Sequence, residues 1–199
     1  YLCASYYQGS FPERDFRFFY RGVGGHAVGD LAARWQEDVI DLRPDVLSVF
    51  VGTNDAERHL GSLLRADAPK TVPDFDFADW ERTYRGLLDQ ARQANPALKI
   101  VLCTPFAAPC GKIVEGALGE YYPLRQRILA QCCVIVERIA ADYGATLVPF
   151  HRLIADLETR LPNGDATYWV WDGIHPTPAG QRLMADCWIG AAARSGVME

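Results

Sequence analysis

The sequence lacks several patterns that would assign a protein to a class at once. None of its 199 residues belongs to an apolar run that approaches the roughly 18 residues of a membrane-spanning helix. An excess of positive charge is also missing, because 20 Lys and Arg stand against 25 Asp and Glu, for a formal net charge of −5. Nucleic-acid-binding domains normally carry a basic patch or stripe. We therefore expect a partner that is neither a membrane nor a nucleic acid.

Motifs for metal ligation and for secretion are also absent. The sequence has no Cys-x-x-Cys pair, and its four histidines do not show the spacing of zinc ligands. Among its six cysteines, Cys103 lies in an apolar run and Cys132 and Cys133 in a helical pattern, which is typical of buried free thiols. No signal-peptide pattern opens the chain. We expect no metal, no cofactor and a cytoplasmic location.

The chain does contain a regular alternation of two hydrophobic patterns. Short apolar runs predict strands at 16–20, 45–51, 98–103 and 145–150. Helical spacing predicts helices at 1–9, 28–41, 77–94, 121–143, from about 151, and from 178 to about 193. This order predicts one α/β domain over 1–199, with a doubly wound parallel sheet in a three-layer α/β/α arrangement. Ligand sites of such sheets lie at the carboxyl ends of the strands, here in loops 21–27, 52–60, 104–119 and 162–176.

The first of these loops is the glycine cluster Gly22-Val23-Gly24-Gly25-His26. Glycines between a strand and a helix can direct backbone N–H groups toward an anion. The alternative is a tight turn that needs positive φ. The spacing of these glycines also fits a dinucleotide-binding fingerprint, but a dinucleotide-binding site would not explain the residues of the other loops.

The second loop, Gly52-Thr53-Asn54-Asp55, follows a buried strand. The side-chain N–H of Asn54 could donate to a developing oxyanion there. The alternative is an Asx turn that leads into the next helix.

The third loop contains Asp172 three residues before His175. A carboxylate at this spacing can fold back on the imidazole, orient it and leave the other ring nitrogen as a general base. The alternative is a surface turn with a solvated histidine. Loop 104–119, with Phe106, Lys112 and Ile113, either shapes a substrate pocket or is a surface loop.

Together these loops resemble the SGNH (GDSL-type) hydrolase superfamily. Residues 21–55 are similar to its second and third sequence blocks joined together, and WDGIHPTPAG is similar to its fifth block. The resemblance implies a flavodoxin-like fold and a serine esterase. It implies that Gly25 and Asn54 form the oxyanion hole, that Asp172 is the orienting acid and that His175 is the general base.

The nucleophile motif of that superfamily, Gly-Asp-Ser after the first strand, is missing. None of the five serines follows a first strand: Ser5, Ser10, Ser48, Ser62 and Ser195. The chain also begins at Tyr1 and not at methionine. We expect a single domain that lacks its first strand and nucleophile turn. The alternative is a catalytically inactive domain of this fold that binds carbohydrate or serves as a scaffold.

The expected reaction is the removal of small acyl groups, acetyl in the first place, from a carbohydrate or a small ester. Three further residues near the predicted cleft are candidates for substrate binding: His26, Asp55 and Trp171. His26 stands where Asp or Asn is common in the superfamily, and a solvated turn histidine is the alternative. Trp171 could instead cap the core.

Overall fold

The computed structural model describes residues 1–63, 74–160 and 165–199. Within them, a parallel sheet contains the strands β1 (Val46–Phe50), β2 (Lys99–Cys103) and β3 (Thr146–Val148), in the order β1-β2-β3. These strands confirm the predictions for 45–51 and 98–103 closely, and the prediction for 145–150 in a shortened form. A parallel sheet of consecutive strands needs a crossover between neighbours, and helices supply it here.

The prediction of a strand at 16–20 is wrong for this structure. These residues have no strand assignment, and no strand among the described residues pairs with them. An apolar, aromatic segment becomes a strand only when a neighbour accepts and donates its backbone hydrogen bonds. The aromatic composition predicted a strand, but composition does not supply the partner that a strand requires.

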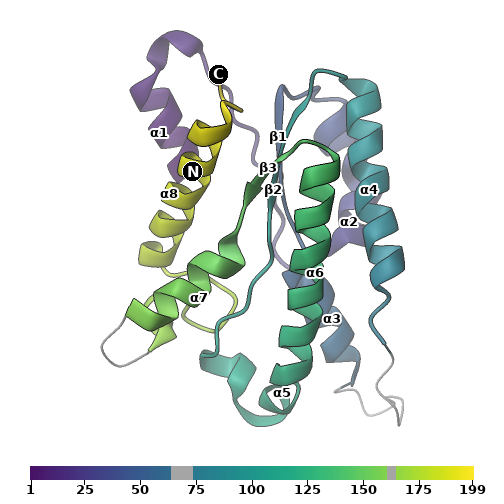
Figure 1. Cartoon of the computed structure of the whole chain (residues 1–199), viewed down its shortest axis with the longest axis vertical. Helices are drawn as coiled ribbons and strands as arrows, with labels where there is room; N and C mark the ends of the chain where they lie inside the picture. Colours follow the sequence, from purple (N-terminus) through teal and green to yellow (C-terminus); the bar gives the residue numbers. More distant parts are fainter. Residues whose placement is uncertain (64–73, 161–164) are drawn as a thin grey trace.

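Helices cover both faces of the sheet (Figure 1). One layer contains α2 (Val28–Trp35), α3 (Thr53–Leu63), α4 (Phe77–Ala94) and α6 (Tyr122–Asp142). The other layer contains α1 (Leu2–Ser10), α7 (Phe150–Arg160) and α8 (Pro178–Ser195). Short helical pieces lie at η1 (Pro12–Arg14), η2 (Gln36–Ile40), η3 (Gly111–Val114), α5 (Gly116–Glu120) and η4 (Ala166–Tyr168).

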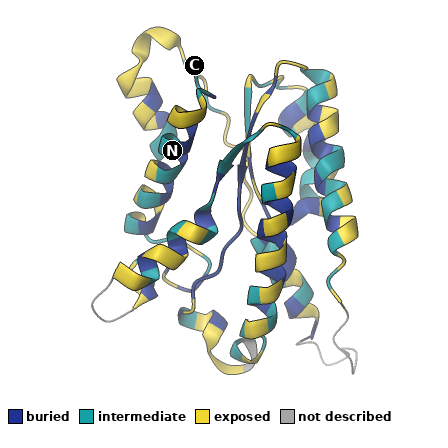
Figure 2. Cartoon of the chain, viewed as in Figure 1, coloured by how far each residue is buried: buried dark blue, intermediate teal, exposed yellow. Residues whose placement is uncertain are grey.

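Two hydrophobic cores lie on the two faces of the sheet, and β2 contributes to both. Ile100 and Leu102 pack with the α2, α3, α4 and α6 layer, whereas Val101 and Cys103 pack with α1, α7 and α8. This division follows from the alternation of side chains along a strand. Figure 2 shows the buried residues facing the sheet and the exposed residues on the outer sides of the helices. The three-layer α/β/α fold is confirmed.

The helix predictions are confirmed to within a few residues, with instructive differences. The helix expected at 28–41 ends at Trp35 and continues as the π turn η2. The loop expected at 52–60 is wrong for most of its length, because these residues belong to α3 (Thr53–Leu63), a helix that the hydrophobic spacing did not predict. At the start of α8, the hydroxyl of Thr177 accepts a hydrogen bond from the Gly180 N–H at 3.2 Å and so caps the helix.

All six cysteines are free thiols, four of them buried and two half-buried. No helix in the described part of the chain has the length and apolar composition needed to cross a membrane.

Candidate active site

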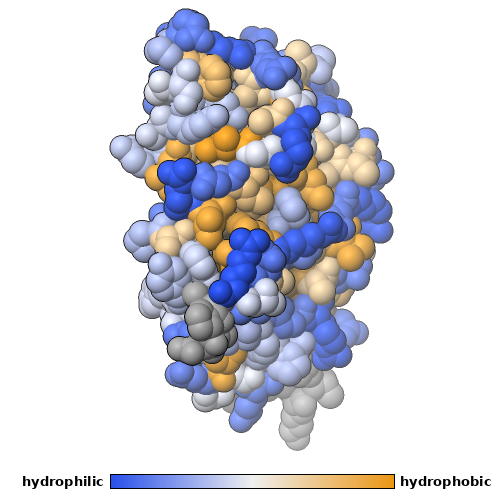
Figure 3. Space-filling model, turned by 60° about the vertical axis from the view of Figure 1, so that its left-hand side comes forward, coloured by the Kyte–Doolittle hydropathy of each residue, from blue (hydrophilic) through white to orange (hydrophobic). Residues whose placement is uncertain are grey.

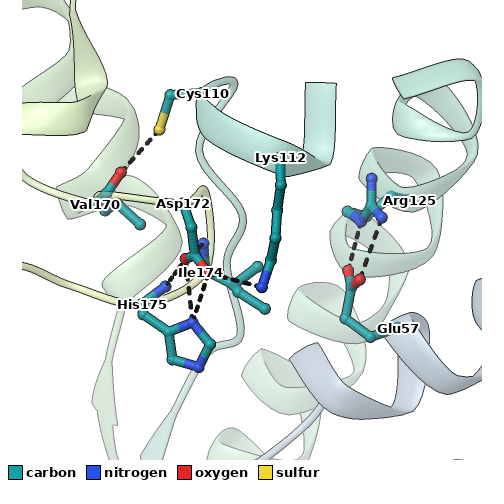
Figure 4. A network of polar contacts seen from close by, with 8 residues as sticks. All are labelled: Glu57, Cys110, Lys112, Arg125, Val170, Asp172, Ile174 and His175. Carbon is teal, nitrogen blue, oxygen red and sulfur yellow. Dashed lines mark hydrogen bonds and ion pairs between the residues drawn. The ribbon is translucent and has the colours of Figure 1, made fainter. Parts of the chain in front are cut away.

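Asp172 and His175 form a bonded pair in the loop ahead of α8. The carboxylate lies 2.9 Å from Nδ1 of His175 through Oδ2, and Oδ1 accepts the backbone N–H of His175 at 2.9 Å and that of Ile174 at 3.2 Å (Figure 4). The Asp172 side chain is 3% exposed and the His175 side chain 60% exposed. The buried carboxylate therefore holds one ring nitrogen, while Nε2 stays accessible for a reacting group.

Local sequence explains why this loop folds back on itself. Gly173 has φ +95°, and a Cβ there would lie 2.3 Å from the Ile113 side chain, so the position requires glycine. Val170 and Pro176 form an isolated antiparallel bridge across the loop. The cap at Thr177 then starts α8. The alternative of a loose surface turn does not fit these contacts.

The segment after β2 presses against this loop. The N–H of Ala108 donates to the Gly173 carbonyl at 2.8 Å, and the Cys110 thiol donates to the Val170 carbonyl at 2.9 Å. Lys112 in η3 reaches Asp172, with Nζ 2.9 Å from Oδ2.

The charge on Asp172 is fixed by these neighbours. Burial alone would raise the pKa of Asp172, but hydrogen bonds from Lys112, His175 and the backbone outweigh it and hold that pKa well below its usual range. The carboxylate is therefore an anion at any pH at which His175 could act as a base.

The glycine loop and the start of α3 form the second part of the site. Gly25 has φ +80°, and its N–H has no acceptor among the described residues. The Asn54 side-chain amide donates to the His26 carbonyl at 3.2 Å, and Arg58 donates to the Gly25 carbonyl at 2.7 Å. One N–H of Asn54 thus ties the two loops together, which leaves the other N–H for a ligand.

Gly52 is required by the close approach of the loop after β2. It has φ +126°, and a Cβ at this position would lie 2.8 Å from the Pro105 ring. The hydroxyl of Thr53 then donates to the Phe106 carbonyl at 3.1 Å. Because the same segment contacts Gly173 two residues later, it connects the Asn54 loop to the Asp172 loop.

The structure corrects one of the predicted contacts with substrate and the expectation for two residues of loop 104–119. Asp55 is buried, and its carboxylate accepts the Val28 N–H at 2.9 Å at the start of α2, so it positions a helix and does not face a ligand. Burial raises the pKa of Asp55. Phe106 and Ile113 are also core residues and do not line a pocket.

Two of the candidates stay near the surface of the site. Trp171 is 59% exposed, and its ring stacks on that of His175 with centroids 5.8 Å apart. His26 is half-buried and lines a cavity of about 1130 Å³ that also reaches Asn54. Neither Asp172 nor His175 lines that cavity.

No serine is bonded to His175 in the described residues. Ser48 lies on β1, where it accepts from the Trp188 indole N–H, and Ser195 accepts from the Thr146 hydroxyl. Ser62 donates to its own helix, and the other two lie in α1. The sequence prediction that none of them is the nucleophile agrees with these positions.

An ion pair that the sequence patterns did not predict lies beneath the site. Arg125 of α6 is fully buried and binds Glu57 of α3 with two hydrogen bonds (Figure 4). It also donates to the Ile113 carbonyl at 3.1 Å. It therefore joins α6, α3 and the turn that carries Lys112. An arginine inside the apolar pattern of a long helix is the signal that could have indicated it.

Comparisons with known proteins agree with this geometry. The model of the GDSL-like lipase/acylhydrolase family matches residues 2–183. The chain is 32% identical over 185 residues to an acetylxylan esterase of Geobacillus stearothermophilus, covering 92% of this chain and 74% of that protein.

Solved structures of esterases and lipases are similar to this chain as well. A putative GDSL-like lipase of Parabacteroides merdae matches with a TM-score of 0.81 and 26% identity, over 98% of this chain and 80% of that one. A structure of the Geobacillus acetylxylan esterase matches with a TM-score of 0.74 and 27% identity, over 95% and 78%. Catalytic mutants of that enzyme include one serine and one aspartate replaced by alanine. With the Asp172–His175 pair on this fold, the chain belongs to the GDSL-like lipase/acylhydrolase family of carboxylic ester hydrolases.

Proposed function

We propose that this protein removes acetyl groups from a carbohydrate ester through a serine, histidine and aspartate mechanism. The observation that carries the proposal is the bonded Asp172–His175 pair, with a buried carboxylate on Nδ1 and an accessible Nε2. The similarity to an acetylxylan esterase supports a carbohydrate acetyl ester as the substrate.

The residues of the chain account for the proton transfers and the charge of this reaction. His175 Nε2 takes the proton of the attacking hydroxyl, and Asp172 stabilises the resulting imidazolium. The carbonyl oxygen becomes negative when the serine ester forms, and the N–H groups of Gly25 and Asn54 would donate to it. His175 then returns the proton to the leaving alcohol, and water repeats the sequence on the ester.

We infer that the nucleophile belongs to a strand placed beside β1, joined to the chain ahead of Tyr1. The cavity of about 1130 Å³ is lined by β1 and by residues 16–19, and also by Gly52, Thr53 and Asn54. Phe50 is 48% exposed although it lies in a strand. Within the described residues β1 has a partner strand on one side only. A strand inserted into this cavity could pair with its other edge, with the carboxyl end near Asn54.

The surface supports an additional packed element. On the face that Figure 3 turns forward, hydrophobic side chains gather in the middle and hydrophilic ones surround them. Uncovered apolar patches of this kind mark surfaces that another segment or a ligand covers.

Trp171 supports a sugar as the alcohol part of the substrate. Its indole is exposed beside His175, and an exposed aromatic face next to a catalytic base can stack on a pyranose ring. We propose that Trp171 and His26 contact the substrate.

The decisive test is ester hydrolysis by the protein expressed with every residue that its gene encodes ahead of Tyr1. We expect hydrolysis of p-nitrophenyl acetate and of acetylated xylo-oligosaccharides, and a fall in kcat of several orders of magnitude in His175→Ala. Unchanged activity in that variant would show that His175 is not the base. Binding of xylo-oligosaccharides without hydrolysis would instead identify a non-catalytic carbohydrate-binding domain.

A further inference from the structure

Lys112 makes a contact for which the proposed mechanism has no use. Its Nζ lies 2.9 Å from Oδ2 of Asp172, the same oxygen that lies 2.9 Å from Nδ1 of His175 (Figure 4). The lysine comes from η3, sixty residues earlier in the chain. One carboxylate oxygen therefore bridges the lysine ammonium and the imidazole.

The turn that carries Lys112 is held firmly against Asp172. A Cβ at Gly111 would lie 2.6 Å from the Cα of Asp172, so the two backbones are in direct contact. Cys110 bonds to the Asp172 loop on one side of the lysine, and Arg125 bonds to the Ile113 carbonyl on the other. Although the Lys112 side chain is half exposed, its starting point is fixed.

A cation on this oxygen changes how strongly the carboxylate attracts the imidazole proton. An unpaired Asp172 would stabilise the imidazolium fully, and His175 would hold its proton to a higher pH. A protonated imidazole cannot accept the proton of a nucleophile. The ion pair lowers the negative charge that His175 experiences and keeps the carboxylate in one orientation.

We propose that Lys112 is a positioning residue that limits the stabilisation of the His175 imidazolium by Asp172 and so keeps the base unprotonated at lower pH. The identification of His175 as the base rests on the proposed function, whereas the ion pair and its effect on titration do not.

Other titratable groups near the pair do not replace this role. Cys110 is on the same turn, but burial, with smaller contributions from Asp165 and Glu158, raises the pKa of its thiol to about 11, so it is neutral. Apart from Lys112 and the Asp172–His175 pair itself, no charged side chain among the described residues forms an ion pair with Asp172 or His175.

The test is an NMR titration of the His175 ring protons, assigned by their absence in His175→Gln. In Lys112→Met we expect the titration midpoint of His175 to rise by about 0.5 pH unit, the size typical of a partly exposed ion pair. Lys112→Arg should restore the original midpoint. The matched control is Lys99→Met, which removes the same charge at the amino end of β2, the opposite end of the sheet, and should leave the midpoint unchanged.

Several outcomes would overturn the proposal. They are an unchanged or lower midpoint in Lys112→Met, or an equal rise in Lys99→Met. Should Lys112→Met lose its fold, Lys112→Gln replaces it, with the same expected rise of the midpoint.

The two proposals fail separately. The titration does not require turnover. If the His175 midpoint rises in Lys112→Met but the protein expressed with the residues encoded ahead of Tyr1 hydrolyses no ester, only the proposed function is refuted. In an active protein, the acid limb of kcat/KM should move to higher pH in Lys112→Met by the same amount, and an unmoved limb with full hydrolysis would refute only the role of Lys112.

Discussion

Single residues at this site owe their chemical state to neighbours that lie far away in the sequence, and Asp172 is the clearest case. Its pKa is held well below the ordinary value of about 4 by Lys112, His175 and two backbone N–H groups. A carboxyl whose pKa is lowered by folding stabilises the native state above its unfolded pKa, and that stabilisation is lost as the pH falls through the folded pKa.

We therefore predict that Asp172→Asn lowers the free energy of unfolding at pH 7, with a difference from the original protein that shrinks below about pH 4. Urea unfolding at pH 7, 4 and 2.5 measures this difference. A difference that stays constant over this range would mean that the charge of Asp172 does not contribute to stability.

Trp171 offers a second prediction at the residue scale. Since a pyranose needs the indole face and p-nitrophenyl acetate does not, Trp171→Ala should raise KM for acetylated xylo-oligosaccharides roughly 3- to 10-fold more than for p-nitrophenyl acetate. Tyr6→Ala removes an exposed aromatic ring from α1 and serves as the control. An equal change for both esters would show that Trp171 acts on the catalytic residues and not on the sugar.

At the scale of elements, the fully buried Arg125 pairs with the partly exposed Glu57 and connects α6 to α3 below the site. Removing one partner of a buried pair leaves the other charge without compensation. We predict that Glu57→Gln lowers the free energy of unfolding by about 3–5 kcal/mol. Asp186→Asn, which breaks the exposed Arg182–Asp186 pair within α8, should change it little, and equal losses in the two variants would contradict a special role for the buried pair.

Some helices could be predicted from the local hydrophobic pattern alone. Residues 77–94 were predicted as a helix and α4 has these bounds, because an amphipathic helix carries its signal locally. Residues 16–20 carry a strand composition but have no strand assignment, because a strand depends on a partner that local sequence does not reveal.

At the scale of the whole molecule, the sheet has one edge with unusual exposure. Amides of β2 lie between two paired strands, whereas β1 has a described partner on one side only. We predict that the amides of Val46–Phe50 exchange with solvent faster than those of Lys99–Cys103 in the chain of residues 1–199.

Protein expressed with the residues encoded ahead of Tyr1 should show slower exchange in β1 and at residues 16–19, while α4 stays unchanged. Hydrogen exchange followed by mass spectrometry measures both. Slow exchange in β1 that depends on protein concentration would instead indicate pairing between two copies of this chain, and an unchanged β1 in the longer protein would refute the inserted strand.

The sequence by itself determined the strands at 45–51 and 98–103, most of the helices and the Asp172–His175 pair, since each depends on residues close together in the chain. Tertiary structure alone decided that Lys112 binds Asp172, that Arg125 binds Glu57 and that Asp55 points inward to Val28. These partners lie 27 to 68 residues apart. Which distant side chains meet depends on how whole layers pack, and that information is not contained in any local pattern.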